Sequence, residues 1–343
     1  MQGETELDLI VRQFNENPSV RGKASIGLIS EVLGPSDWLG GPGDDAAILS
    51  GHHPAEPAGD RPGGAYWEGC LLVAGEAIFP PFVAADPHGA GVAAVLTNVN
   101  DIAAMGGRPL AIVDTIVGPR ELARQALEGM REAASIYGMP IVGGHLSERD
   151  GPPALSAFIL GRAVRPLSAR RAAPGQALLL AACLDGDMRE DFPFFSAIER
   201  RGARIRDDVA LLPVAAEAGV CVAAKDVSMA GLLGSLAMLL EPNHLGCAVE
   251  LESVPCPGGV ALSRWLQAFP SYGFLVCSTA ERAEDCRRLF ESGGLTCRRI
   301  GTLDGSGRLR ARLNGREALL LDLAASPVTG LARPGRIPPD ADA

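Results

Sequence analysis

The chain has 343 residues, 47% of them hydrophobic and 21% charged, and its formal net charge is −10 at pH 7. This length exceeds the usual size of one hydrophobic core and predicts two domains. The acidic balance argues against a nucleic-acid-binding surface, because neutralising phosphates requires clustered Lys and Arg.

The sequence shows no pattern typical of a segment that spans a membrane or directs secretion. The sequence holds no run of about eighteen uncharged apolar residues, and its N-terminus opens with acidic residues. We therefore expect neither a membrane span nor a secretory signal.

The eight cysteines form no Cys-x-x-Cys pair and mostly lie in apolar runs, which argues against a zinc site and favours reduced, packed thiols in a cytoplasmic protein.

The N-terminal part predicts two short helices and an acidic turn. Apolar residues at helical spacing mark the first helix (Leu7, Ile10, Val11 and Phe14), and the second covers residues 25–33. Adjacent carboxylates, Asp44 and Asp45, follow Gly43 and precede a short apolar strand. Like charges on neighbouring residues repel, so the pair fits either a solvent-exposed turn or a bound divalent cation.

A long loop separates this turn from the next strand. Residues 50–68 are rich in Gly, Pro, Ala and His and show no hydrophobic period. Its histidines, His52 and His53, lack further ligand spacing and fit solvated side chains better than metal ligands. The strand that begins near Cys70 ends at an acidic residue, Glu76.

The following helix carries two candidate site residues. Asp86 suits the N-cap and Pro87 the first helical position. Apolar residues then recur at three- and four-residue spacing (Val92, Val95, Leu96, Val99, Ile102 and Ala103). Asn98 and Asp101 are three residues apart on the other face, so we expect them side by side, pointing away from the packed stripe. They fit either a solvated face or a site for metal or phosphate.

The remaining elements predict a layered α/β chain. Gly106 and Gly107 end the helix, and a strand over 109–117, a helix over 120–137, a strand over 140–142 ending at Gly143-Gly144, and a strand over 154–164 follow. The Pro-, Arg- and Ala-rich stretch 165–175 is the expected domain boundary, which gives domains over 1–165 and 175–327 and a loose tail over 328–343. In the second domain, strands near 177–183, 220–224, 246–251, 273–278 and 297–302 alternate with helices near 206–218, 228–240, 258–268 and 280–291.

Two further segments suit the binding of an anion. Gly143 and Gly144 let the backbone approach a phosphate closely, although an ordinary turn explains them equally. Lys225 and Asp226 lead into a predicted helix whose first N–H groups would favour a substrate phosphate. Capping of that helix by Ser228 or Asp226 accounts for these residues as well.

Four segments, in this order along the chain, resemble the ATP-dependent superfamily of aminoimidazole ribonucleotide (AIR) synthase: residues 43–49, 75–109, 143–147 and 225–232. The superfamily includes thiamine-monophosphate kinase, selenophosphate synthetase and a hydrogenase maturation factor. The resemblance implies a two-domain α/β fold with a C-terminal α/β domain. It also implies a homodimer, in which the N-terminal mixed sheets of two copies form a shared barrel.

The resemblance also implies a site for ATP and Mg²⁺. Metal ions bridging the ATP phosphates would be held by four acidic residues, namely Asp44, Asp45, Glu76 and Asp101. The nucleotide would contact Gly43, Asn98, Gly143, Gly144 and His145. Lys225 and Asp226 would face the acceptor substrate as the candidate catalytic residues. Metal bridges allow an acidic site to bind a polyanion.

Several positions depart from the patterns of individual members. Relatives mostly carry Asp where this chain has Glu76, His where it has Lys225, and a second acid where it has Met229. His145 resembles selenophosphate synthetase, but no cysteine precedes Cys70, which argues against selenium chemistry. Residues 271–276 replace an acidic stretch of thiamine-monophosphate kinase, so that activity ranks below an unassigned one.

Three hypotheses about function follow. The leading one is ATP- and Mg²⁺-dependent phosphoryl transfer to a small metabolite, or its activation by phosphorylation. The second is a catalytically silent nucleotide-binding regulatory protein. The third, ranked last, is a carboxylate-rich metal-binding protein that takes no nucleotide.

Overall fold

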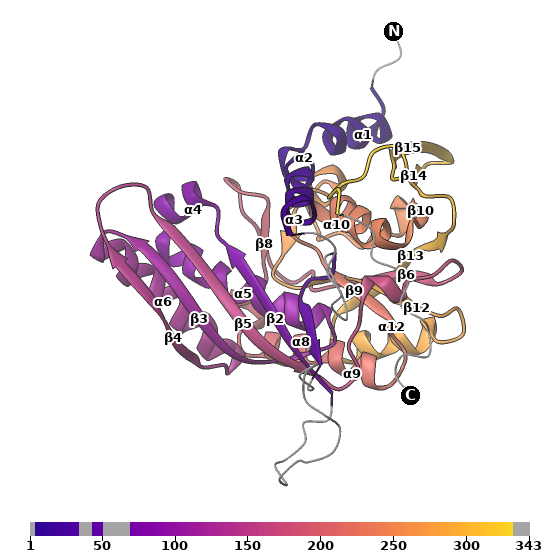
Figure 1. Ribbon diagram of the computed structural model, residues 1–343. Coiled ribbons are helices and arrows are strands. Elements are labelled where there is room, and N and C mark those ends of the chain that lie inside the picture. The colour runs from indigo at the N-terminus through magenta and orange to yellow at the C-terminus, as the bar shows by residue number, and fades with distance from the viewer. Residues whose placement is uncertain (1–3, 34–42, 51–68, 332–343) are drawn as a thin grey trace.

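The computed structural model describes residues 4–33, 43–50 and 69–331. The predicted loop beyond residue 50, with both of its histidines, and the tail beyond residue 331 lie outside the described residues. The described part contains a five-stranded sheet in the order β1-β2-β5-β3-β4 and a seven-stranded sheet in the order β15-β14-β10-β13-β6-β12-β9 (Figure 1). A small third sheet has the order β11-β8-β7.

The first sheet is mixed, as predicted. Its strands are β1 (Ala47–Ser50), β2 (Cys70–Ala77), β3 (Arg108–Gly118), β4 (Ile141–Glu148) and β5 (Ala154–Ala163). Strands β3 and β4 are parallel, and the other neighbouring pairs are antiparallel. Its connecting helices are α4 (Pro80–Ala85), α5 (Pro87–Ala104) and α6 (Arg120–Tyr137). Residues of α5 and α6 share one buried cluster with inward-facing Ile112 and Ile116 of β3, so these helices cover one face of the sheet.

Helices α5 and α6 approach each other closely at two glycines. A Cβ atom on Gly91 would lie 2.0 Å from the carbonyl oxygen of Ala126, and one on Gly129 would lie 2.0 Å from that of His88. No real side chain tolerates such distances, so any larger residue would push the helices apart. The close contact fixes α5, which carries several of the predicted site residues.

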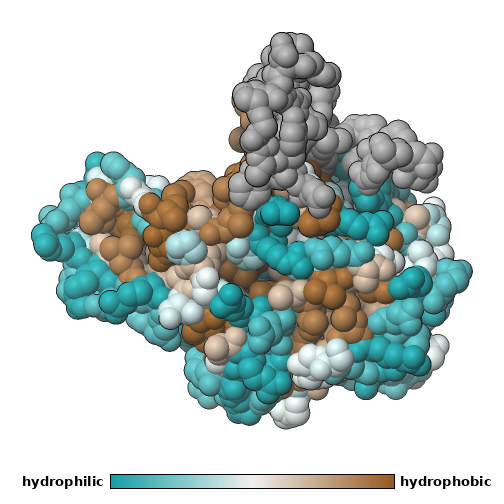
Figure 2. Space-filling model, turned by 90° about the horizontal axis from the view of Figure 1, so that it is seen from below, coloured by the Kyte–Doolittle hydropathy of each residue, from teal (hydrophilic) through white to brown (hydrophobic). Residues whose placement is uncertain are grey.

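The other face of the first sheet is open and apolar. Its side chains Leu49, Val73, Val113, Phe158 and Leu160 are each 38–47% exposed. Val113 pairs with Phe158, and Val73 with Leu160, so these residues are cross-strand neighbours on one surface. In Figure 2, hydrophobic residues gather on the left part of the molecule, which holds this sheet.

The second sheet is covered on both faces. Its strands are β6 (Ala177–Ala182), β9 (Ala223–Asp226), β10 (Gly246–Glu250), β12 (Gly273–Ser278), β13 (Thr296–Asp304), β14 (Arg308–Leu313) and β15 (Arg316–Asp322). The small sheet consists of β7 (Asp187–Met188), β8 (Phe194–Ser196) and β11 (Phe269–Pro270). The helices are α7 (Ile198–Arg201), α8 (Arg204–Val209), α9 (Leu211–Glu217), α10 (Gly231–Leu240), α11 (Leu262–Trp265) and α12 (Ala283–Ser292). Every residue of β6 and β12 is buried, which explains their continuous apolar sequences.

The two units share a core. One face of β6 and β12 packs with α8, α9, α12 and residues of α5 in one cluster, and the other face packs with α10. The N-terminal helices are α1 (Glu6–Glu16), α2 (Pro18–Gly22) and α3 (Gly27–Leu33). Buried residues of α1 join the cluster of α10, β14 and β15, and Figure 1 shows α1 beside these elements. The short 3₁₀ helices are η1 (Lys23–Ile26), η2 (Ala169–Arg171), η3 (Glu241–Asn243) and η4 (Leu251–Ser253).

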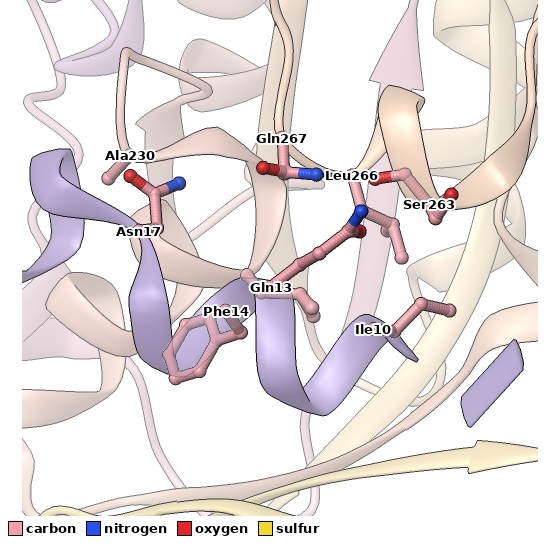
Figure 3. Close-up of a pocket in the computed structure, with 9 residues that line it drawn as sticks. Ile10, Gln13, Phe14, Asn17, Ala230, Ser263, Leu266 and Gln267 are labelled. Atoms are coloured by element: carbon pink, nitrogen blue, oxygen red, sulfur yellow. Dashed lines mark hydrogen bonds between the residues drawn. The ribbon is translucent and has the colours of Figure 1, made fainter. Parts of the chain in front are cut away.

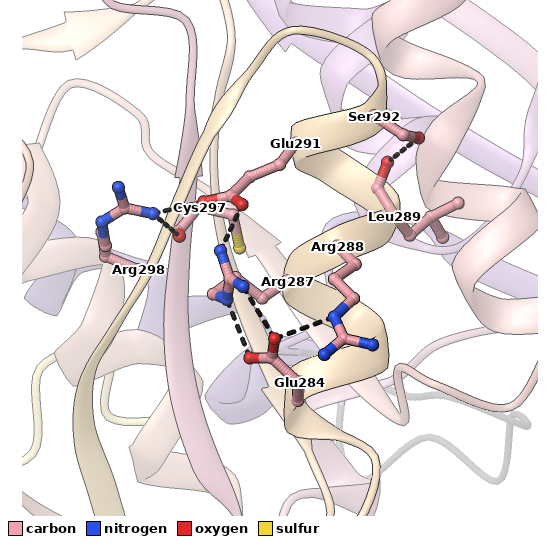
Figure 4. A network of polar contacts seen from close by, with 8 residues as sticks. All are labelled: Glu284, Arg287, Arg288, Leu289, Glu291, Ser292, Cys297 and Arg298. Carbon is pink, nitrogen blue, oxygen red and sulfur yellow. Dashed lines mark hydrogen bonds and ion pairs between the residues drawn. The ribbon is translucent and has the colours of Figure 1, made fainter.

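Two surface features belong to this second unit. A shallow pocket of about 250 Å³, counted with the solvent at its mouth, lies between α1 and the segments around α10 and α11 (Figure 3). A chain of ion pairs runs along α12, where Arg287 contacts Glu284 and Glu291, and Glu291 also contacts Arg298 (Figure 4). Exposed ion pairs of this kind contribute little to stability. We assign no catalytic or binding role to the ion pairs or to the pocket.

Several predicted elements are confirmed. The Asp86 side chain accepts a hydrogen bond of 2.8 Å from the Gly89 N–H and caps α5. Gly106 adopts φ 69° after the end of α5, where the left-handed region favours glycine. All eight cysteines are free thiols. Among the described residues, no helix is long and apolar enough to cross a bilayer.

Other predictions are wrong. Gly143 and Gly144 lie inside β4, in extended backbone, and do not end a strand. Helix α10 begins at Gly231, and its N-cap, Ala230, makes no side-chain hydrogen bond, so neither Ser228 nor Asp226 caps it. The predicted helix near 258–268 is confined to α11. Strands β14 and β15 and the small sheet were not predicted.

The predicted loose tail begins with an ordered segment. The buried Glu241 carboxylate accepts hydrogen bonds from the N–H groups of Val328, Thr329 and Gly330, at 2.9 to 3.2 Å. The Thr329 hydroxyl donates to the same carboxylate at 3.0 Å. Hydrogen bonds to an ionised group are the stronger kind, so these residues are held in place.

Candidate metal and nucleotide site

Three carboxylates from distant parts of the chain meet between the two sheets. Asp45 precedes β1, Asp101 lies in the last turn of α5, and Asp226 ends β9. One oxygen atom from each lies within 4.8 Å of the others. Helix α5 contacts β9 and also β2, and β1 is hydrogen-bonded to β2, so the three elements meet. A group of hard oxygen atoms at this spacing is the donor set that Mg²⁺ or Ca²⁺ prefers.

Lys225 lies within the same group. Its Nζ forms an ion pair with Asp45 Oδ1 and lies 3.2 Å from Asp226 Oδ1. The backbone N–H of Asp226 donates to Asp45 Oδ2 at 3.1 Å, which fixes the second oxygen of that carboxylate. The side chains of Asp45, Lys225 and Asp226 are at most 10% exposed. The ammonium thus sits between two carboxylates from which water is largely excluded.

Helix α5 contributes polar atoms without partners. Asp101 is 6% exposed, and its Oδ2 is buried with no hydrogen-bond partner. Asn98 donates to the Ala94 carbonyl at 2.8 Å, and Asn100 donates to the Ser271 carbonyl at 3.2 Å. The Oδ1 atoms of both asparagines are also buried and unpartnered. Because an unpaired buried oxygen is costly, Asp101 fits a bound cation, so the residues present suit Mg²⁺.

The burial of α5 corrects one expectation. The sequence predicts that Asn98 and Asp101 point away from the packed stripe, towards solvent or ligand. Both are buried, and Asp101 lies beside Asp226 of the second domain. The Asn98 amide donates within its own helix, and its contact with nucleotide stays a prediction. Asn100, which the sequence analysis did not select, bridges to the second domain instead.

The group holds three carboxylates and one ammonium, so its negative charges outnumber its positive charge. Burial raises the pKa of Asp45 to about 7, an effect that Asp226 increases and Lys225 opposes. Burial also raises the pKa of Asp101 well above its ordinary value, and the charges of Asp226 and Glu76 raise it further. Burial opposes the charged form of Lys225, but Asp45 and Asp226 outweigh it and raise the Lys225 pKa. A divalent cation would relieve the repulsion that remains among the carboxylates.

Glu76 and a second acid, Asp114, lie in one row across the first sheet. Glu76 pairs with Ala157 of β5, and Ala157 pairs with Asp114 of β3. Paired residues share a face, and two strand spacings put Glu76 and Asp114 about 10 Å apart. The pKa of Glu76 is raised, first by exclusion of water and then by the charge of Asp226.

Asp114 is a candidate that the sequence analysis missed. It is 8% exposed, and burial raises its pKa. It occupies the inward position between Ile112 and Ile116 in β3. A carboxylate at an inward position of an alternating apolar strand is the signal that would have found it.

Asp44 does not join the group. Its carboxylate accepts hydrogen bonds from the Ser168 hydroxyl at 2.6 Å and from the Ala169 N–H at 2.7 Å. These contacts hold the start of η2, in the connection between the domains. Gly43, with φ 117°, allows the turn that lets Asp44 and Asp45 reach separate partners. The metal role of Asp44 and the nucleotide contact of Gly43 stay predictions.

The remaining candidates lie at the far edge of the first sheet. Gly143, Gly144 and His145 belong to β4, three strands away from β2. A Cβ atom on Gly144 would lie 2.6 Å from the Asp114 carboxylate, so this glycine leaves room for that acid. His145 pairs with Thr115 of β3. Within one chain these residues do not meet the carboxylates, and their contact with nucleotide stays a prediction.

Two α/β units with an acidic group between them define an AIR synthase-like two-domain protein. Residues 43–163 match the N-terminal domain model of AIR synthase related proteins, and residues 184–314 match the C-terminal domain model. The chain is 37% identical to "Uncharacterized protein sll0787" of Synechocystis sp. over 265 residues, which is 76% of this chain and 82% of that protein. The chain belongs to the AIR synthase-related family.

Other relatives carry names that state an activity. A thiamine-monophosphate kinase of Rhodopirellula baltica is 33% identical over 169 residues, covering 48% of this chain and 50% of the kinase. The solved structure "AaThiL complexed with AMPPCP and TMP" has a TM-score of 0.63 at 18% identity, over 85% of this chain and 92% of that one. "T. maritima PurL complexed with ATP" has a TM-score of 0.63 at 19% identity, over 78% and 47%. These two structures establish the likeness of the fold.

Proposed function

We propose that this protein is an ATP- and Mg²⁺-dependent enzyme that transfers a phosphoryl group to a small metabolite, or activates it by phosphorylation. The observation that supports this most directly is the meeting of Asp45, Asp101 and Asp226 within 4.8 Å, with a buried Asp101 oxygen that lacks a partner. Relatives named as a kinase and as a complex with ATP support the same reaction class.

The proposed roles follow from position. Asp101 would hold Mg²⁺ together with the lone pairs of Asp45 and Asp226 that Lys225 does not use, and Glu76 extends the acidic surface along the first sheet. Mg²⁺ supplies the positive charge that neutralises the phosphates during transfer. Lys225 holds Asp45 and Asp226 in their positions and adds one further positive charge. Phosphoryl transfer needs positioning and charge neutralisation more than covalent chemistry, and these residues provide both.

The test is nucleotide binding measured by calorimetry. ATP should bind the wild-type protein with Mg²⁺ and far more weakly with EDTA, and Asp101→Asn should lose the Mg²⁺-dependent part. A metabolite screen that monitors ADP release then identifies the acceptor. Absence of Mg²⁺-dependent ATP binding, together with no effect of Asp101→Asn, would reject the proposal.

A second candidate is a nucleotide-binding regulatory protein without turnover. Its supporting observation is the Lys225 ammonium, which already occupies the space between two of the carboxylates. ATP binding without ADP formation across the screen favours this candidate. One substrate that gives steady ADP release excludes it.

We also propose a homodimer formed by the first sheet. Its open face exposes apolar cross-strand neighbours, including Val113 paired with Phe158. A contiguous apolar surface of this kind marks an interaction site. A second copy supplies a matching apolar face, and two such sheets facing each other form the shared barrel expected from the resemblance. His145 is paired with Thr115 at the edge of this sheet, where a second copy would come near it.

A further inference from the structure

The carboxylate group contains a cation supplied by the chain itself. Lys225 Nζ contacts one oxygen of Asp45 and lies 3.2 Å from one oxygen of Asp226. These two acids are also two of the three members of the candidate metal group. The ammonium therefore occupies the space between two donors that would otherwise share a divalent ion. The Asp101 oxygen without a partner is left for a second cation.

The choice of lysine is unusual for this chain. Of its 31 basic residues only Lys23 and Lys225 are lysines, and the rest are arginines. An ammonium is a compact point charge, whereas a guanidinium is a wide planar fork. A compact charge fits between two carboxylates much as a metal ion does.

The backbone keeps the ammonium in place. Lys225 lies in β9, paired with Leu275 of the fully buried strand β12. Its own side chain is 10% exposed, and its neighbour Asp226 is tied to Asp45 through the backbone N–H. A cation fixed in this way cannot share its position with Mg²⁺, because two positive charges would then lie side by side.

We propose that Lys225 is a tethered cation that replaces one divalent ion, so that the nucleotide site takes one metal ion fewer than its carboxylates alone would hold. This inference rests on the metal-dependent nucleotide site proposed above. It assigns Lys225 a positioning and charge-balancing role, and it makes the number of bound metal ions the property to measure.

The decisive experiment counts Mn²⁺ ions bound per chain in the presence of ATP, by electron paramagnetic resonance of the free ion. Lys225→Met should bind one more Mn²⁺ than the wild type, because removal of the ammonium opens the position between Asp45 and Asp226. An equal count in the wild type and Lys225→Met overturns the inference.

A second measurement uses the unaltered protein, in case Lys225→Met does not fold. Lys23 and Lys225 are the only lysines, so mass spectrometry after brief acylation reads each ammonium separately. Addition of Mn²⁺ and ATP should leave Lys225 as poorly labelled as before. A marked rise in its labelling means that metal displaces the ammonium, and this overturns the inference.

The two proposals fail in different ways. If neither the wild type nor Lys225→Met binds Mn²⁺ in an ATP-dependent manner, the proposed nucleotide site is wrong and the tethered cation fails with it. If the wild type binds Mn²⁺ with ATP but Lys225→Met gains no ion, only the tethered cation is wrong.

Discussion

Lys225 and Asp45 lie 180 residues apart in the chain, and their side chains form a nearly water-free ion pair at the junction of the two sheets. Asp45 leads into the first sheet and Lys225 lies in an edge strand of the second. The pair thus links the domains at the point where the candidate metal ligands meet. A substitution at either residue should therefore change both the stability of the fold and the binding of metal.

Removal of one partner of this pair should destabilise the protein. Asp45→Ala leaves the buried Lys225 ammonium with Asp226 alone, and we expect a loss of about 3 kcal/mol. The matched control is Glu4→Ala, which breaks the exposed ion pair with Arg12 and should have little effect on stability. Urea denaturation measures both. Similar losses for the two variants would contradict the buried character of the Lys225 pair.

The raised pKa of Asp45 predicts a pH dependence. The Asp45 carboxyl titrates near 7 in the folded protein and at 3.8 ordinarily. Between these values the folded state binds a proton that the unfolded state has lost, so this contribution is full below about pH 3.8 and is lost as pH rises through about 7. The free energy of unfolding in EDTA should therefore fall across this range. Asp45→Asn should flatten the slope, and an unchanged slope would refute the assignment.

Asp44 and Asp101 should respond differently to the same substitution. Asp101→Asn removes a charge from the group and should abolish Mg²⁺-dependent ATP binding, with little loss of stability because its carboxylate has an oxygen without a partner. Asp44→Asn should leave the metal count unchanged. It weakens charge-assisted hydrogen bonds to Ser168 and Ala169 and should cost about 1–2 kcal/mol. Calorimetry and thermal unfolding separate the two effects.

The sequence predicted the local elements better than the meeting of distant ones. Asp86 and Pro87 define the start of α5, and the glycines after it define its end, because capping and turn formation depend on neighbouring residues. The contact of Asn100 with the Ser271 carbonyl depends on the second domain, far along the chain, and no local pattern contains it. The same reason explains why Asp44 and Asp45, adjacent in sequence, have separate partners.

The missed strands have a related cause. Strand β14 alternates arginines with buried Leu309, Ala311 and Leu313, a pattern typical of a half-covered strand. Its outward arginines pair with acids of neighbouring strands, such as Arg312 with Glu250. Because every second residue is charged, the segment resembles an exposed loop when the sequence is considered alone. The neighbouring strands that carry the acidic partners are what identify it as a strand.

Gly144 predicts a sharp contrast with its neighbour. A Cβ atom on Gly144 would meet the Asp114 carboxylate at 2.6 Å, whereas one on Gly143 meets nothing within 4 Å. Gly144→Ala should cost about 1–3 kcal/mol, and Gly143→Ala should be nearly neutral. Asp114→Ala should remove most of the penalty when it is combined with Gly144→Ala. Purely additive effects in this double-mutant cycle would show that the two positions do not contact each other.

The open face of the first sheet predicts the oligomeric state. Phe158 is 47% exposed among apolar neighbours, and Leu127 is 38% exposed on α6, outside this surface. Sedimentation analysis should find a dimer for the wild type. Phe158→Glu should yield a monomer, since the substitution places a charge in the proposed apolar interface, where its desolvation is costly. Leu127→Glu adds the same charge elsewhere and should remain dimeric. A monomeric wild type, or a Phe158→Glu variant that dimerises like the wild type, would place the interface elsewhere or remove it.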